Sequence, residues 1–363
     1  MMESKPLLTV IVPAYNVENY LGDCLDSIMG QTQMDHKVIV VNDGSTDDTG
    51  KIAQRYADKY PDRVQCITQE NQGLGAARNT GLARVDTEYV TFLDSDDWWD
   101  CLFIEKLKQE LAGHEGRPDI VFSLPWIYDS ISKRCLPWYD KDRLEEIFYP
   151  DADDGNGLSR ELNIHTEPEL YMLEPSACRR IYRRQFLEDL QFRFPVGVKW
   201  EDVQPHFYLT HRASCCIGLR DTGFLYRINT GSQTTATTGA SRLDIIPVYR
   251  ETLQMAYAEN WAKEEVAYIL RMLCSFTIWS IDVTNAEYID PLVKQLRQLF
   301  RSVPKAYFRV YFKLCSPRPK KERVFFWILR SPFYGLLKDP GIRRIGSNAI
   351  VWVRKMRGKW SKR

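Results

Sequence analysis

Residues 89–99 read Tyr-Val-Thr-Phe-Leu-Asp-Ser-Asp-Asp-Trp-Trp. The first five residues are apolar or β-favouring and predict a buried strand, and aspartates follow at positions 94, 96 and 97. Carboxylates this close repel one another unless a cation, a hydrogen-bond donor or water neutralises them. Two interpretations are open for this cluster. It is either a cation site at the carboxyl end of a strand or an acidic turn that caps a helix beginning near Trp99.

The neighbouring segments predict an α/β fold with a Rossmann-like, mostly parallel sheet. Short apolar runs that predict strands alternate with segments of helical periodicity, and the strands are expected at residues 7–13, 37–41, 63–68 and 88–93. A helix is expected to follow each of the first three strands, the second starting at Ser45. In such sheets ligands bind beyond the carboxyl ends of the strands. Tyr15 and Asn16, Asp43, and Asp94 to Asp97 each follow a predicted strand, so we expect them at one edge of one sheet.

These residue types suit a nucleotide diphosphate that carries a transferable group. Tyr15 offers a face for stacking on the base, and the Asp43 carboxylate can accept the imide N–H of the base. Asp94 suits the ribose hydroxyls. Asp96 is the candidate ligand for Mg²⁺ or Mn²⁺, because these ions take few protein carboxylates and complete their shell with phosphate and water.

A glycine-rich segment follows the third predicted strand and contains Arg78. It reads Gly73-Leu74-Gly75-Ala76-Ala77-Arg78-Asn79. The glycines allow backbone to approach a phosphate. The guanidinium of Arg78 is expected to pair either with phosphate or with the aspartate cluster.

Four ordered motifs resemble those of the family 2 glycosyltransferases. They are residues 10–16 (VIVPAYN), 41–47 (VNDGSTD), 71–79 (NQGLGAARN) and 92–97 (FLDSDD), and the resemblance extends over about residues 7–235. It implies a GT-A fold, a nucleotide-sugar donor, a divalent metal and inversion at the anomeric carbon. It places Tyr15 and Asp43 at the base, Asp94 on the ribose side and Asp96 at the metal. Pro13, Asn16 and Ser95 lie in the same motifs and are assigned with them to donor binding.

The resemblance also supplies a catalytic base. The family has a Glu-Asp motif about a hundred residues after the aspartate cluster. Glu201-Asp202 matches this motif. Asp202 is therefore expected to deprotonate the acceptor hydroxyl. Residues 226–234 resemble a later family segment, in which Arg227 either approaches the diphosphate or belongs to a structural strand. Trp98 and Trp99 either shape the acceptor pocket or pack in the core.

The domain organisation follows from these patterns. Residues 1–235 are expected to form the GT-A domain, with a donor half at 1–115 and an acceptor half at 116–235. Within it, residues 140–170 are acidic and are expected to be an insertion or a flexible loop. A helical extension is expected at 236–315, followed by a basic, aromatic tail at 316–363.

Composition narrows the class of protein. The chain has 363 residues, 44% of them hydrophobic and 27% charged, as in ordinary globular proteins. Its nine scattered cysteines show no metal-binding or redox spacing and suit a reducing cytoplasm. We expect no signal peptide and no membrane-spanning helix.

The charge is distributed unevenly along the chain. The tail carries fourteen Lys or Arg and two acidic residues, a net charge of +12, so the other 315 residues carry −11. Its cations are interleaved with aromatic and leucine residues, and the tail contains no nucleic-acid-binding motif. This composition favours an anionic membrane surface over nucleic acid as the binding partner of the tail. The alternative is a solvated basic terminus. The first interpretation predicts peripheral attachment to the cytoplasmic face of the membrane.

The function predicted is metal-dependent transfer of a sugar, from a UDP-sugar rather than a GDP-sugar, to a hydroxyl of a glycan or lipid-linked acceptor in bacterial polysaccharide assembly. One alternative is a catalytically inactive partner subunit that binds nucleotide sugar. The intact set Asp43, Asp94, Asp96 and Asp202 disfavours it. A nucleotidyltransferase is disfavoured because residues 13–16 lack a glycine-rich phosphate loop.

Overall fold

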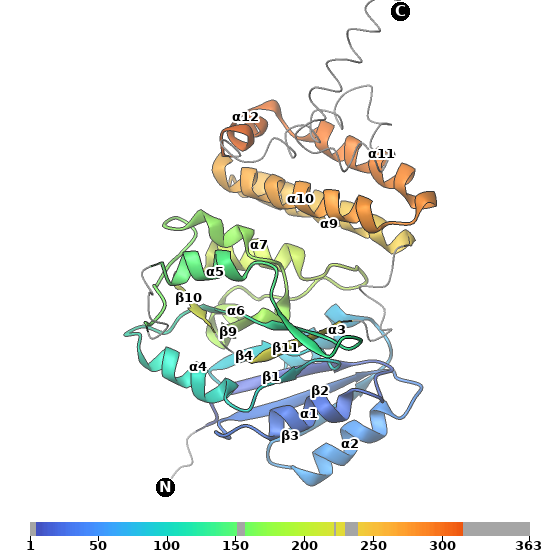
Figure 1. Ribbon diagram of the computed structural model, residues 1–363, viewed down its shortest axis with the longest axis vertical. Coiled ribbons are helices and arrows are strands. Elements are labelled where there is room, and N and C mark those ends of the chain that lie inside the picture. The colour runs from blue at the N-terminus through green and yellow to red at the C-terminus, as the bar shows by residue number, and fades with distance from the viewer. Residues whose placement is uncertain (1–4, 151–156, 221–222, 229–238, 315–363) are drawn as a thin grey trace, which may run out of the picture. The chain divides into compact units, whose positions relative to one another are not determined.

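A computed structural model describes residues 5–150, 157–220, 223–228 and 239–314 of the chain (Figure 1). The chain divides into two compact units, residues 1–232 and 233–363. The boundary predicted at residue 235 falls in the segment 229–238, outside the described residues. Each unit is described by itself.

The first unit is built on a seven-stranded sheet that is parallel except for one strand. Its order is β10-β6-β9-β4-β1-β2-β3, and β9 pairs antiparallel with both β4 and β6. The mostly parallel sheet predicted from the sequence is confirmed. The strands are β1 (Leu8–Ala14), β2 (His36–Asp43), β3 (Val64–Gln69), β4 (Tyr89–Phe92), β6 (Ile120–Ser123), β9 (Arg180–Arg183) and β10 (Cys216–Leu219).

Strand β1 lies inside the sheet, between β4 and β2, and is apolar on both faces. All seven of its residues are buried, and it pairs in parallel register with β2 on one side and β4 on the other. Helices that pack on the two faces account for this continuous apolar run. The helices of this unit are α1 (Leu21–Met29), α2 (Thr49–Lys59), α3 (Leu74–Leu82), α4 (Phe103–Ala112), α5 (Lys141–Phe148), α6 (Arg184–Asp189) and α7 (Val203–Arg212).

Two helix starts differ from the sequence-based predictions. Helix α2 begins at Thr49 rather than at Ser45, and Asp48 precedes it without a capping bond from its side chain. No helix begins near Trp99. Residues 98–99 form the short strand β5, and α4 begins at Phe103. The side-chain carboxylate of Asp100 accepts the backbone N–H of Leu102 at 2.9 Å, which directs the chain from β5 into the helix.

Strand β5 belongs to a second, four-stranded sheet, ordered β5-β11-β7-β8. Its other members are β7 (Trp126–Asp129), β8 (Arg134–Pro137) and β11 (Phe224–Ile228). Because β11 pairs with β5, residues near 226 lie beside the segment that carries the aspartate cluster. This pairing connects two parts of the sequence that are about 130 residues apart.

Residues 140–170 were predicted to be an insertion or a flexible loop, and the flexible-loop alternative was wrong for the first part. Residues 141–148 form α5, in which Leu144, Ile147 and Phe148 are buried at helical spacing. Short 3₁₀ helices cover Pro168–Met172 and Ala177–Arg179. Residues 151–156 of the acidic loop lie outside the described residues.

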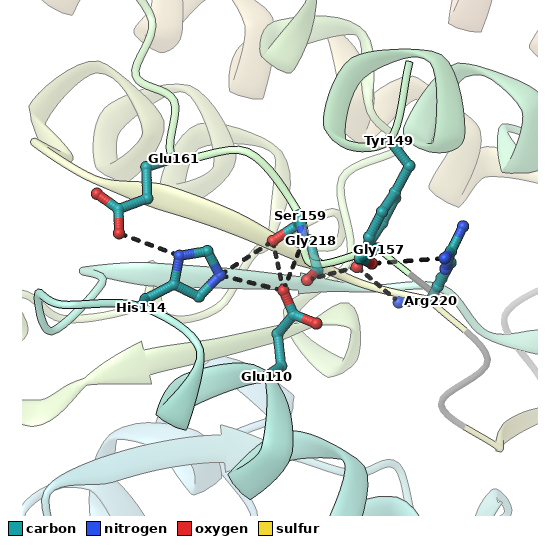
Figure 2. Close-up of polar contacts among 8 residues, drawn as sticks. All are labelled: Glu110, His114, Tyr149, Gly157, Ser159, Glu161, Gly218 and Arg220. Atoms are coloured by element: carbon teal, nitrogen blue, oxygen red, sulfur yellow. Dashed lines mark hydrogen bonds and ion pairs between the residues drawn. The ribbon is translucent and has the colours of Figure 1, made fainter. Parts of the chain in front are cut away.

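Residues 157–161 are attached to α4 by a partly buried polar network, here called the His114 network (Figure 2). The backbone N–H and hydroxyl of Ser159 both donate to Glu110, at 2.9 and 2.7 Å. The ring of His114 contacts Glu110 at 3.1 Å with one nitrogen and Glu161 at 3.0 Å with the other. The Ser159 hydroxyl donates to Glu110 and lies 3.5 Å from a ring nitrogen of His114, so these side chains tie residues 157–161 to α4.

The second unit is helical, as predicted for the region after residue 235. It contains a 3₁₀ turn (Ala240–Asp244) and helices α9 (Ile245–Ala258), α10 (Lys263–Val283), α11 (Ala286–Ser302) and α12 (Lys305–Leu314). Among the residues described, no helix combines the length and apolar character needed to cross a membrane. The basic tail at 316–363 lies outside the described residues.

Candidate active site

The strand-end residues predicted to meet at one edge of the sheet do so. Asn16 follows β1 with a left-handed φ of 52°. Its backbone N–H donates to the Ser45 hydroxyl at 3.1 Å, and its side-chain oxygen accepts the Thr46 N–H at 2.9 Å. These bonds join the segment after β1 to the segment after β2. Tyr15, next to Asn16, keeps 47% of its surface exposed, which leaves an aromatic face available at this edge.

Asp43 ends β2 and organises the glycine-rich segment. It is 3% exposed, and its carboxylate accepts hydrogen bonds from Gln69 Nε2 at 2.7 Å, Gln72 N at 3.0 Å and Gly73 N at 2.8 Å. A carboxylate offers about four acceptor positions, so three are used within the protein. Asp43 therefore shapes the loop that precedes α3 and has one acceptor position left for a ligand.

The aspartate cluster follows β4, and its members have different surroundings. Asp94 accepts a hydrogen bond from Arg78 Nη2 at 3.1 Å, and a third of its side chain is exposed. Asp97 is 1% exposed and accepts the Arg227 N–H at 2.8 Å, whereas its Oδ2 has no hydrogen-bond partner within the described residues. Burial, followed by the charges of Asp96 and Asp94, raises the pKa of Asp97 well above its usual range. Asp97 is thus a structural group that holds β11.

The cluster has the donor type that a hard cation prefers. Its three aspartates offer carboxylate oxygens, and the charges of Asp96 and Asp94 add to burial in raising the pKa of Asp97. Within the described residues, no group of three or more His, Cys, Asp or Glu side chains is arranged to hold a metal by itself. Carboxylate oxygens are ligands that Mg²⁺ and Mn²⁺ accept, and these ions complete their shell with phosphate and water.

Arg227, on β11, packs against the cluster. Its Nε donates to the backbone oxygen of Asp96 at 2.8 Å, and its guanidinium lies 4.4 Å from the centre of the Trp98 ring. The two tryptophans of β5 have different surroundings. Trp98 is beside the site, whereas Trp99 is buried and stacks on Phe103 at 4.0 Å in the core. Pro13 and Ser95 are also buried.

Asp202 lies at the start of α7, in the other half of the unit. It is half-buried, and the preceding Glu201 is 8% exposed. Burial and the adjacent Glu201 charge raise the pKa of the Asp202 carboxyl, while Arg78 and Arg180 oppose that shift. A carboxylate whose pKa is shifted toward neutral is a better proton acceptor than an ordinary aspartate.

Arg78 joins the two halves. It is 2% exposed, pairs with Asp94 of the aspartate cluster and forms a close ion pair with Glu201, the neighbour of Asp202. One of the two partners predicted from the sequence, the aspartate cluster, is in contact with Arg78. The pair with Glu201 was not predicted, because 123 residues separate the two and no local pattern links them.

Comparisons with known proteins agree with this geometry. A family model described as "Glycosyl transferase family 2" matches residues 9–149. The chain is 38% identical over 234 residues to glycosyltransferase GlyG of Streptococcus pneumoniae, covering 62% of this chain and 72% of GlyG. It is 36% identical over 225 residues to glycosyltransferase GlyA of the same species, covering 62% of this chain. That match spans only 31% of the length of GlyA.

Solved structures share the fold. A crystal structure of S. aureus TarS 1-349 in complex with UDP-GlcNAc superposes with a TM-score of 0.70 at 21% identity, over 92% of this chain and 89% of that one. The mannosyltransferase PcManGT from Pyrobaculum calidifontis, in complex with GDP-Man and Mn²⁺, gives a TM-score of 0.51 at 17% identity, over 93% and 86%. These likenesses confirm the predicted GT-A fold. The family model and the match to GlyG show that the chain belongs to glycosyl transferase family 2.

Proposed function

We propose that the protein is an inverting glycosyltransferase that transfers a sugar from a nucleotide-diphosphate sugar to a hydroxyl group of an acceptor. A UDP-sugar is favoured over a GDP-sugar as the donor. The observation that carries the proposal is the shared cation Arg78, which holds Asp94 beside the strand-end edge and Glu201 beside Asp202. A donor pocket and a base brought together in this way match the needs of an in-line displacement.

The donor is assigned to the exposed edge of the sheet. Tyr15 offers its face to the base, and the fourth acceptor position of Asp43 is available to the base edge. The exposed part of Asp94 is assigned to the ribose. Asp96 would hold Mg²⁺ or Mn²⁺, whose charge stabilises the departing diphosphate when it is bound. The structure of PcManGT, which contains GDP-Man and Mn²⁺, supports testing a divalent ion together with a nucleotide sugar.

Asp202 is assigned as the base. Its carboxylate accepts the proton of the acceptor hydroxyl as that oxygen attacks the anomeric carbon from the side opposite the diphosphate. The acceptor is proposed to be a glycan or a lipid-linked sugar in polysaccharide assembly. UDP-GlcNAc in TarS supports a UDP-sugar as the first donor to test.

The test is a screen of nucleotide sugars for donor hydrolysis in the presence of Mn²⁺. We expect release of UDP from at least one UDP-sugar, and loss of that release when the metal is chelated. Tight UDP binding with no turnover of any donor, with candidate acceptors present, would instead support the inactive partner subunit.

We also propose that the basic tail attaches the protein to the cytoplasmic face of the membrane. Each basic residue near an anionic surface contributes about 1 kcal/mol. Truncation after Leu314 is expected to abolish co-sedimentation with anionic vesicles at low salt. Unchanged co-sedimentation of the truncated protein would contradict this proposal.

A further inference from the structure

Helix α3 contacts the segment that leads to Asp202. On one side the helix packs against β1 and β2, where Gly81 is so close to Ile11 that a Cβ at Gly81 would lie 2.5 Å from Ile11 Cγ2. Elsewhere, three of its residues contact residues 194–201. These three residues, Gly75, Arg78 and Asn79, are here called the α3 clamp.

Asn79 and Gly75 hold the beginning of that segment. The side-chain amide of Asn79 donates to the Phe194 carbonyl at 2.9 Å and accepts the Phe194 N–H at 2.7 Å, so it binds one residue at two points. A Cβ on Gly75 would lie 2.1 Å from the Pro195 oxygen. The helix backbone therefore approaches the segment directly, which only glycine allows. This is a different role from the phosphate approach suggested by the sequence.

Arg78 holds the end of the segment. Its guanidinium pairs with Glu201 and lies over the rings of Phe92 and Phe194, at 5.8 and 5.4 Å. Between the two attachment points, Trp200 has a φ of 66°, a conformation that non-glycine residues adopt rarely and only where their surroundings hold them. The backbone immediately before Glu201 and Asp202 is thus fixed from both sides.

We propose that the α3 clamp is a positioning device for Asp202 that joins the base-bearing segment to the donor-side carboxylate Asp94. The proposal rests on the proposed function, because it takes Asp202 as the base. Among the described residues, Asn79 is hydrogen-bonded to Phe194 and Gly75 packs against Pro195 and Glu201, rather than against Asp43 or Asp94. Loosening the clamp at these two residues should therefore slow turnover without weakening UDP binding.

The experiment compares Asn79→Ala and Gly75→Ala with two matched controls in the full-length chain. Gly22→Ala also adds a methyl group to a helical glycine, but its Cβ meets nothing within 4 Å. Ser159→Ala also removes side-chain hydrogen bonds from a partly buried network, here the His114 network. Thermal unfolding identifies the variants that remain folded, and calorimetry measures UDP binding with Mn²⁺.

Turnover is measured as hydrolysis of the donor found in the screen. In both clamp variants we expect kcat to fall about 10- to 100-fold, because displacement of a catalytic group by about 1 Å has an effect of that order, with the UDP Kd within twofold of wild type. Both controls should keep the wild-type kcat. Wild-type kcat in the folded clamp variants, or a parallel loss of UDP affinity and kcat, would overturn the proposal.

Hydrogen exchange separates failure of the clamp from failure of the proposed function. The Phe194 N–H is bonded to Asn79, so Asn79→Ala should speed exchange in residues 194–202 while β1 stays protected. This measurement needs no activity. An inactive wild-type protein would reject the proposed function, whereas unchanged exchange in Asn79→Ala would reject the clamp whatever the activity.

Discussion

Two partly buried polar networks hold distant segments to helices in the first unit, and they differ in what they join. The Arg78 network connects the donor-side Asp94 with Glu201, next to the assigned base. The His114 network connects α4 with residues 157–161 and includes none of the assigned site residues (Figure 2). The first has a permanent cation at its centre and the second a titratable imidazole. We therefore expect changes in the Arg78 network to affect turnover, and changes in the His114 network to affect stability alone.

The largest effect is expected at the base itself. Asp202→Asn removes the proton acceptor while keeping the shape of the side chain. We expect turnover to fall about 10²- to 10⁴-fold with UDP binding retained. Steady-state hydrolysis and calorimetry test this prediction together, and unimpaired turnover would reject Asp202 as the base.

The next largest effect is expected on the stability of the protein when Arg78, the centre of the Arg78 network, is replaced. Arg78→Gln leaves the carboxylates of Asp94 and Glu201 without their shared cation, and Glu201 is almost fully buried. We expect a loss of about 3–5 kcal/mol in the free energy of unfolding. Urea denaturation measures this loss.

A second substitution serves as its control. Adding Glu201→Gln to Arg78→Gln removes one of the uncompensated charges and should restore part of the stability. Independent, additive losses from the two substitutions would show that the ion pair has no energetic role.

A smaller effect is expected from the His114 network. Ser159→Ala removes a hydroxyl that donates to Glu110 at 2.7 Å. We expect a loss of about 1–3 kcal/mol in the free energy of unfolding, because the partner is a charged group, with no change in kcat. A lowered kcat in this variant would contradict the view that the His114 network affects stability but not turnover.

The smallest effect is a shift in the pH profile. The raised pKa of Asp202 means that turnover should rise with pH as this carboxyl loses its proton. The charge of Glu201 contributes to the raised pKa, while Arg78 and Arg180 oppose it. Glu201→Gln should therefore lower the pKa of Asp202 and move the rising limb of kcat/KM to lower pH. An unmoved or oppositely moved limb would show that Glu201 does not influence the base.

Local patterns were sufficient where one segment decides its own structure. The apolar runs of β1, β2 and β4 and the alternation with α1 to α3 predicted the parallel sheet, and the sheet placed Tyr15, Asp43 and Asp94 at one edge. Prediction failed where the secondary structure of a segment depends on pairing with a strand that is distant in the sequence. Trp98 and Trp99 form a strand because β11 pairs with them across the chain.

The sequence by itself determined the family, the strand-end residues and the identity of the candidate base, since each lies within a short ordered motif. Only the tertiary structure decided what Arg78, Gly75 and Asn79 contact. Their partners at residues 194–201 are more than a hundred positions away, and the contacts exist only after the sheet has brought α3 and the base-bearing segment together. Burial then gives these contacts their strength, because an ion pair such as Arg78–Glu201 is weakly screened once water is excluded.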